Sequence, residues 1–224
     1  MNRRTKLSAA TVSIAIIVLS LGLFAYFDQT TPAGQESTAA TIRVACVGDS
    51  ITNSTGYPDE LWMLLGENYT VGNFGWGATT VSLSSRNPYM NQAMFQAAKD
   101  FQPDIVVIIL GTNDAHPDNQ KYVTSFVGNY LSLVRAFQEL SSKPQIWIVK
   151  PPPIFHNGTG LSTEFFDTEI IPLIEQVAEQ ANVPLIDVYT ALANHPDYFL
   201  DGVHPTPVGT QAIATEVYAA ITST

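Results

Sequence analysis

Short runs of apolar, β-branched residues alternate along the chain with longer segments in which apolar residues recur every three or four positions. The short runs are typical of buried strands, and the longer segments are typical of amphipathic helices. The predicted strands are Ile42–Val47, Tyr69–Phe74, Ile105–Leu110, Ile146–Val149 and Pro184–Val188. The predicted helices are Pro58–Leu65, Tyr89–Phe101, Tyr122–Leu140, Thr163–Asn182 and Val208–Ile221.

The alternation of strands and helices predicts the fold class. Strands that are apolar on both faces are typical of a parallel sheet that is covered by helices on both sides. We therefore expect an α/β protein, a doubly wound three-layer α/β/α sandwich with a five-stranded parallel sheet. In such sheets ligands bind at the carboxyl ends of the strands, so residues that carry chemistry should follow strand ends.

The first 28 residues have a different pattern. Leu7–Phe27 contains no charged residue, and Arg3, Arg4 and Lys6 precede it. This run is long enough to span a bilayer, and its positive flank predicts a cytoplasmic amino end. We expect residues 1–28 to be a signal anchor or a cleaved signal peptide, with a buried core helix as the alternative. Residues 29–40 read as a flexible linker and residues 41–224 as one domain outside the cytoplasm.

Composition and charge exclude several classes of function. The chain has 10 Lys and Arg against 20 Asp and Glu, a net charge of −10, and no basic cluster beyond residue 6. Nucleic acid binding is therefore not expected. Cys46 is the only cysteine, which excludes an intrachain disulfide and a cysteine-rich metal site. Sequons at Asn53, Asn68 and Asn157 fit an exported protein but carry little weight.

A serine and a histidine stand at positions suited to nucleophilic catalysis. Ser50 follows the first predicted strand directly, although a serine there is also a common helix N-cap. Asp201 and His204 lie three residues apart near the carboxyl terminus, close enough for the carboxylate to hold one ring nitrogen while the other faces outward. A serine nucleophile needs such a base and orienting group.

Two further strand ends supply hydrogen-bond donors. The second strand leads into Asn73–Thr80, which contains Gly77, and the third leads into Gly111–Asp114, which contains Asn113. Backbone N–H groups and one Asn side chain can form an oxyanion hole. Each segment alone reads as a turn, but all of them follow strand ends.

Asp114, His116 and Asp118 are spaced like metal ligands. They lie in a proline-containing loop, and no second cluster of possible ligands accompanies them. We therefore expect no metal at this position.

Four blocks in this order, GDSIT, NFGWGATT, GTND and DGVH, resemble the SGNH hydrolase superfamily, often called the GDSL family. The resemblance implies a flavodoxin-like fold and a serine hydrolase that needs no metal or other cofactor. It implies that Ser50 is the nucleophile, His204 the general base and Asp201 its orienting group. The oxyanion donors would be the N–H groups of Ser50 and Gly77 and the side chain of Asn113.

The second block departs from the family pattern N-x-G-x-x-G. Asn73, Gly75 and Gly77 are one residue closer together than that pattern requires. Gly75 is therefore an alternative to Gly77 as the oxyanion donor.

A softer resemblance, in Asn87–Tyr89, Phe101–Ile108 and Pro151–Pro153, points to the sialate and xylan O-acetylesterases. It implies a short-chain acyl ester, with acetylated carbohydrate as the expected substrate. Trp76, Tyr89 and Phe155 could contact such a substrate, or they could be ordinary core aromatics. Alternatives within the family are a lipase, a lysophospholipase, a thioesterase or an acyltransferase. An alternative of another class is a catalytically silent, membrane-tethered glycan-binding module.

Overall fold

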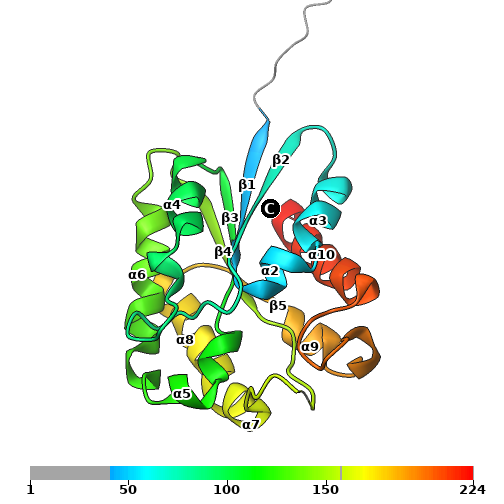
Figure 1. The fold of residues 1–224 in the computed structure, drawn as a ribbon. Coiled ribbons are helices and arrows are strands. Elements are labelled where there is room, and N and C mark those ends of the chain that lie inside the picture. The colour runs from blue at the N-terminus through cyan, green and yellow to red at the C-terminus, as the bar shows by residue number, and fades with distance from the viewer. Residues whose placement is uncertain (1–40, 157, 224) are drawn as a thin grey trace, which may run out of the picture. The chain divides into compact units, whose positions relative to one another are not determined.

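A computed structural model describes residues 41–156 and 158–223, which contain a central five-stranded sheet (Figure 1). The strand order is β2-β1-β3-β4-β5, and every neighbouring pair is parallel. The predicted parallel sheet is confirmed, and each predicted strand overlaps an observed one. The strands are β1 (Ile42–Gly48), β2 (Tyr69–Gly75), β3 (Ile105–Ile109), β4 (Gln145–Lys150) and β5 (Leu185–Asp187).

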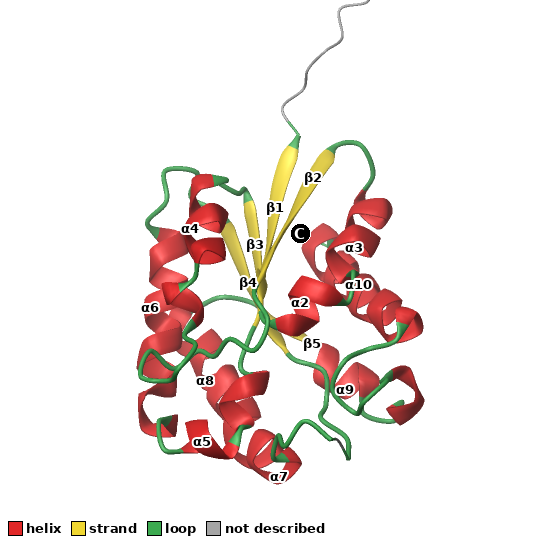
Figure 2. Cartoon of the chain, in the orientation of Figure 1, coloured by secondary structure: helices red, strands yellow, loops and turns green. Residues whose placement is uncertain are grey.

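Helices connect the strands and cover both faces of the sheet (Figure 2). The α-helices are α2 (Ser50–Ser54), α3 (Tyr57–Leu65), α4 (Ala93–Asp100), α5 (Pro117–Gln120), α6 (Phe126–Gln138), α7 (Thr163–Phe165), α8 (Ile171–Ala181), α9 (Val188–Leu192) and α10 (Pro207–Thr222). Short 3₁₀ segments are Tyr89–Asn91, Thr112–Ala115, Val123–Ser125 and Pro196–Tyr198, and Phe166–Ile170 is a π-helical turn.

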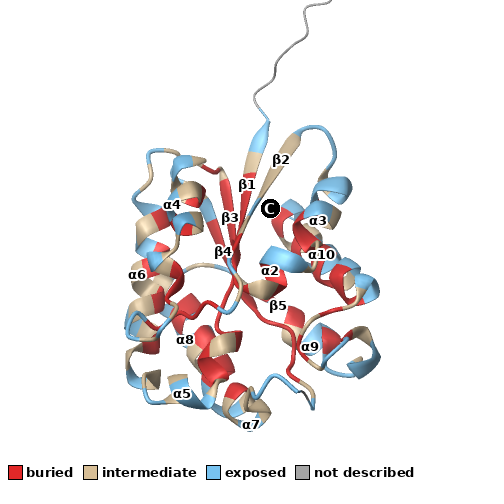
Figure 3. Cartoon of the chain, viewed as in Figure 1, coloured by how far each residue is buried: buried red, intermediate tan, exposed pale blue. Residues whose placement is uncertain are grey.

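Alternate residues of each strand enter two separate cores. Val106 and Ile108 of β3 pack in one core with α4, α6 and α8, whereas Val107 and Ile109 pack in the other with α3, α9 and α10. All five residues of β3 are buried (Figure 3). The sheet is therefore covered on both sides, which explains its near-continuous apolar strands and confirms the three-layer α/β/α architecture.

Three predicted helices differ in detail from the observed ones. The predicted helix Tyr89–Phe101 is broken at Gln92, whose backbone is extended and whose side chain donates to Asn87 and Pro88. The predicted helix Thr163–Asn182 contains the π-helical turn, and the one at Tyr122–Leu140 begins with a 3₁₀ turn. The helices α2, α5 and α9 were not predicted because they have four or five residues each, too few to show a helical period.

The sheet topology places a switch point at the carboxyl ends of β1 and β3. The chain leaves β1 through α2 and α3 on one face and leaves β3 through α6 on the other face. Because the two adjacent strands are followed by connections on opposite faces, their carboxyl ends form the switch point at which ligands bind in such folds.

The expected anchor and linker, residues 1–40, and the sequon at Asn157 lie outside the described residues. Within the part of the chain that the structure describes, none of the helices combines the length and the apolar character needed to cross a bilayer.

Candidate active site

Ser50, His204 and Asp201 meet at the carboxyl edge of the sheet. Ser50 is the first residue of α2, which begins directly after β1. The His204 Nε2 atom lies 2.9 Å from Ser50 Oγ, and the His204 Nδ1 atom lies 2.8 Å from Asp201 Oδ2. The structure thus joins two segments that are 154 residues apart into one chain of hydrogen bonds.

The side chain of Asp201 also holds the backbone of the loop that carries it and His204. Asp201 Oδ1 accepts hydrogen bonds from the N–H groups of Val203 at 3.0 Å and His204 at 2.7 Å. Partial burial raises the pKa of Asp201, but these bonds and the His204 ring outweigh it and lower the pKa to about 2. Asp201 is therefore ionised at neutral pH and can hold a proton on Nδ1 of the ring.

Asp49 is a member of the site that the sequence did not single out. Its side chain is fully buried and caps α2, because Oδ1 accepts from the Ile51 N–H at 2.9 Å. Its Oδ2 accepts from Asn113 Nδ2 at 3.3 Å. Burial raises the pKa of Asp49 to about 6. The signal available in the sequence was only its place next to Ser50. Asp49 fixes both the serine-bearing helix and the Asn113 amide.

Asn113 lies after β3, next to the serine-bearing turn. Its Nδ2 donates to the Thr79 carbonyl at 3.0 Å, in addition to the longer bond to Asp49. Through these two contacts Asn113 joins the ends of β1 and β3 to the loop that follows β2. The amide is therefore held in a fixed orientation before any substrate arrives.

The geometry favours Gly77 over Gly75 as the second N–H donor. The Gly75 N–H donates to Asn73 Oδ1 at 3.0 Å, and a Cβ at Gly75 would lie 2.4 Å from the Asn53 backbone nitrogen. Gly75 thus serves close packing against α2. Among the described residues no acceptor is found for the Gly77 N–H, and a Cβ there would meet nothing within 4 Å. Of the two glycine N–H groups, that of Gly77 is the one left without an acceptor in the described part of the chain.

Side-chain hydrogen bonds from Asn87 hold the turn at Gly77 and Ala78. Asn87 Nδ2 donates to the carbonyls of Gly77 at 3.2 Å and Ala78 at 3.0 Å, and Gln92 donates to Asn87 Oδ1 at 2.9 Å. Ala78 has a φ of +57°, a left-handed conformation that costs energy for a residue with a side chain. Asn87 therefore stabilises a strained turn beside the candidate oxyanion donor. No pattern in the sequence indicates this role.

Asp114, His116 and Asp118 do not gather around a common point. Asp114 is buried and accepts from the N–H groups of Val81 at 2.9 Å and Ser82 at 3.1 Å. Burial raises the pKa of Asp114 to about 7. His116 Nδ1 accepts from the Asp118 N–H. Across residues 41–156 and 158–223, no group of three or more possible metal ligands is found.

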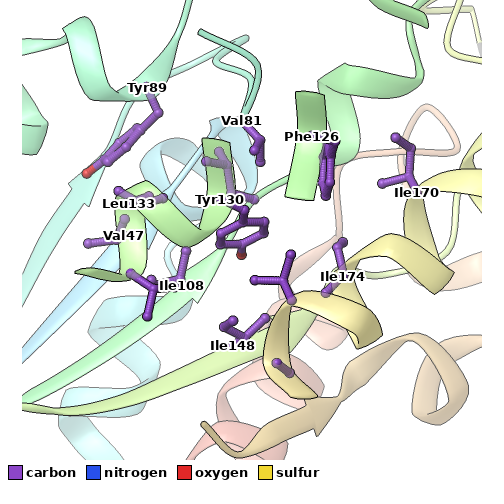
Figure 4. Packing of buried hydrophobic residues seen from close by; sticks show 14 of the residues in the cluster. Val47, Val81, Tyr89, Ile108, Phe126, Tyr130, Leu133, Ile148, Ile170 and Ile174 are labelled. Atoms are coloured by element: carbon purple, nitrogen blue, oxygen red, sulfur yellow. The ribbon is translucent and has the colours of Figure 1, made fainter. Parts of the chain in front are cut away.

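The three aromatic residues proposed to contact substrate have different surroundings. Trp76 is 43% exposed and precedes Gly77. Tyr89 is fully buried among core side chains (Figure 4), and its hydroxyl donates to the Phe74 carbonyl at 2.7 Å. The prediction that Tyr89 contacts substrate is therefore wrong. Phe155 is half-buried against Phe199, with ring centroids 5.1 Å apart, so most of its ring packs inside the protein.

Comparisons with known proteins agree with this fold and these motifs. The model of the GDSL-like Lipase/Acylhydrolase family matches residues 46–212. The chain is 33% identical to an acetylxylan esterase of Xylanibacter ruminicola over 216 residues, which is 85% of this chain and 44% of that protein. The chain thus spans less than half the length of that relative.

Solved structures with similar folds include an acetyl xylan esterase, with a TM-score of 0.67 and 20% identity. That match covers 80% of this chain and 100% of the other. A carbohydrate acetylesterase of Sinorhizobium meliloti has a TM-score of 0.65 and 18% identity, covering 82% and 99%. At these identities the structures establish the fold alone. The family match covers most of the domain, so the chain belongs to the GDSL-like Lipase/Acylhydrolase family, a family of ester-hydrolysing enzymes.

Proposed function

We propose that this protein is a serine esterase that removes acetyl groups from carbohydrate through a covalent acyl-enzyme. The observation that carries the proposal is the continuous series of hydrogen bonds from Asp201 through His204 to Ser50. A serine hydroxyl is a weak nucleophile, and an adjacent oriented base is what activates it.

In the proposed first step, Ser50 Oγ attacks the carbonyl carbon of the ester. Its proton passes to His204 Nε2, which lies 2.9 Å away. Asp201 holds Nδ1 protonated, so Nε2 has the lone pair that this transfer needs, and the carboxylate then stabilises the imidazolium. The tetrahedral intermediate collapses, the C–O bond to the sugar breaks, and the sugar oxygen takes the proton from His204.

The negative charge that develops on the carbonyl oxygen needs preorganised donors. We propose the N–H groups of Ser50 and Gly77, for which no acceptor is found in the described part of the chain. Asn113 Nδ2 is the third donor. Its 3.3 Å bond to Asp49 is longer than a typical N–H···O bond, so this hydrogen is the one that the amide can share with the oxyanion without rotating. Each such donor contributes about 3 kcal/mol.

Water completes the cycle in a second step of the same kind. His204 removes a proton from water, which attacks the acetyl-Ser50 carbonyl. The Ser50 oxygen leaves with the proton from His204, and acetate is released. No metal or other cofactor enters either step, because the nucleophile, base and electrophilic donors all come from the chain.

Carbohydrate is the proposed substrate because of the activities for which similar proteins are named. One sequence relative is named an acetylxylan esterase, and one structural neighbour is named a carbohydrate acetylesterase. The exposed indole of Trp76 lies next to Gly77 in the chain and offers a flat apolar surface for a sugar ring. We propose that Trp76 makes this contact, with the exposed edge of Phe155 as a second surface.

We further propose that the enzyme acts outside the cytoplasm. The support is the sequence of residues 1–28, in which a basic flank precedes an uncharged run of 21 residues. A fusion of alkaline phosphatase to the carboxyl terminus tests this directly. Phosphatase activity in intact cells is expected, and activity that appears only after lysis would contradict an extracytoplasmic domain.

The hydrolytic function is tested with the full chain and three esters: p-nitrophenyl acetate, p-nitrophenyl octanoate and acetylated xylan. We expect release of acetate from the first and third substrates and little cleavage of octanoate. Ser50→Ala should abolish turnover. Ser132→Ala is the matched control, because the hydroxyl that it removes lies on the exposed face of α6 and, among the described residues, bonds only to the Gly128 carbonyl. Equal activity of Ser50→Ala and wild type would refute the mechanism. Preferential cleavage of octanoate would indicate a lipase or thioesterase.

A further inference from the structure

Two neighbouring cavities lie beside Asn113, one of the candidate oxyanion donors. The larger, of about 210 Å³, is lined mostly by polar residues: Ala78, Thr80, Arg86, Asn87, Asn113, His116, Asp118 and Asn119. The smaller, of about 120 Å³, shares Arg86, Asp118 and Asn119 with it and is also lined by Lys121 and Tyr122. We call these two adjoining cavities the side groove.

The side groove adjoins the candidate oxyanion donors. Asn113 lines its larger cavity and also bonds to Asp49, the residue before Ser50. Ala78, which lines the same cavity, follows Gly77. A substrate whose ester carbonyl is bound by Gly77 and Asn113 would therefore have the neighbouring part of its glycan at the entrance of the side groove.

Arg86 is unusual among the cationic side chains of the domain. Five of the seven Lys and Arg residues after residue 40 have an ion pair, a ring contact or a hydrogen bond to a carbonyl: Arg43, Lys99, Lys121, Lys143 and Lys150. Within residues 41–156 and 158–223, no such partner is found for Arg86 or for Arg135 of α6. Arg86 lines both cavities of the side groove, whereas Arg135 lies on the last turn of its helix.

The charges in the groove favour an anionic group at Arg86. The chain as a whole has a net charge of −10, so its surface generally repels anions. In the side groove, Arg86 and Lys121 face one acidic side chain, Asp118, and no ion pair between Arg86 and Asp118 is found in the described part of the chain. A guanidinium group binds a carboxylate through two parallel hydrogen bonds. A neutral sugar would need only the amide and carboxylate groups of Asn119 and Asp118.

We propose that the side groove binds a carboxylate-bearing sugar of an acetylated glycan, with Arg86 as the residue that recognises the carboxylate. This inference rests on the proposed function and specifies its substrate class. Asn119 donates to the Asn113 backbone carbonyl at 2.8 Å, so its side-chain oxygen is available to accept from a sugar hydroxyl. Arg86 is a specificity-determining residue, since it contacts the glycan and not the reacting atoms.

The test compares the full chain on three substrates: p-nitrophenyl acetate, acetylated xylotetraose, and the same acetylated oligosaccharide with a glucuronic acid branch. For an exposed ion pair we expect kcat/KM to be about 5-fold higher for the branched than for the neutral oligosaccharide. This preference should decline as salt is raised from low to physiological concentration. Arg86→Gln should remove the preference. Arg135→Gln, which removes the same charge outside the groove, should retain it.

Two results would overturn the inference. One is equal kcat/KM of wild type for the branched and the neutral oligosaccharide. The other is a preference that persists in Arg86→Gln. If wild type cleaves p-nitrophenyl acetate and the neutral oligosaccharide in either case, only the assignment of the side groove is wrong. If wild type cleaves none of the three esters, the proposed function itself is wrong, and the assignment of the groove fails with it.

Discussion

Replacing Asp201 by Asn tests how the imidazole of His204 is held. The Asn oxygen can still accept from the N–H groups of Val203 and His204, as Asp201 Oδ1 does now. The new amide group replaces Oδ2, which lies 2.8 Å from His204 Nδ1. Because an amide N–H donates, Nδ1 must become the acceptor, and the ring proton moves to Nε2. The nitrogen that faces Ser50 at 2.9 Å then has no lone pair for the serine proton.

We expect Asp201→Asn to lower kcat by about 10⁴-fold, which corresponds to about 5 kcal/mol of barrier. The backbone contacts of the loop are preserved, but the ionised carboxylate that stabilises the fold at pH 7 is lost, so the protein should stay folded with a lower thermal unfolding midpoint. Steady-state hydrolysis of p-nitrophenyl acetate and a thermal melt of the same preparation measure both quantities. The pKa of about 2 for Asp201 means that its ionised form adds stability above the unfolded value of 3.8 and loses it as the pH falls toward 2.

Asp197→Asn is the matched control, because Asp197 is exposed in the preceding 3₁₀ segment. It should leave kcat and the melting temperature unchanged. A loss of less than 10-fold in Asp201→Asn, with the protein folded, would refute the role of Asp201 as the group that sets the tautomer of His204.

Four further variants test other parts of the account. Asn87→Ala should lower kcat for p-nitrophenyl acetate by about 10-fold, because the Gly77–Ala78 turn loses its two side-chain bonds, and a change in KM alone would contradict this. Burial raises the pKa of Asp114 to about 7, so ionisation of this carboxyl destabilises the wild-type fold as the pH rises from 4 to 7. In urea unfolding between pH 5 and 8, the free energy of unfolding should therefore fall less in Asp114→Asn than in wild type. An identical pH dependence would refute that origin. Tyr89→Phe should lower the free energy of unfolding by about 1–3 kcal/mol, because the Phe74 carbonyl loses its buried donor, while KM for acetylated xylan stays unchanged. Trp76→Ala should raise that KM instead, and a raised KM in Tyr89→Phe would show that Tyr89 contacts substrate after all.

The sheet could be predicted from the sequence because its strands are buried on both faces. The uninterrupted run Ile105–Ile109, for example, marks β3 without any knowledge of its neighbours. The break at Gln92 could not be predicted, because it depends on side-chain bonds to Asn87 and Pro88 that exist only in the folded loop. The spacing of hydrophobic residues along the chain indicates which residues are buried. It does not indicate where side-chain hydrogen bonds take the place of the backbone hydrogen bonds of a helix.

The site was predictable to the extent that its residues follow strand ends. Ser50 and Asn113 follow adjacent parallel strands, so their proximity is a consequence of topology. Tyr89 was misassigned because an aromatic residue after a proline reads equally as a loop residue or as a core residue. Asp49 was missed because burial gives it its role, and burial of a carboxylate depends on the tertiary packing around it.

The most direct test of the central claim is to identify the residue that a serine-reactive phosphonate labels. The full-length wild-type chain would be treated with the reagent, digested and analysed by mass spectrometry, alongside Ser50→Ala and His204→Ala. We predict one stoichiometric label on Ser50, no label in Ser50→Ala, and labelling slowed by orders of magnitude in His204→Ala because the hydroxyl loses its base. A folded wild-type protein that remains unlabelled, or a label on another serine, would contradict the assignment of Ser50 as the nucleophile.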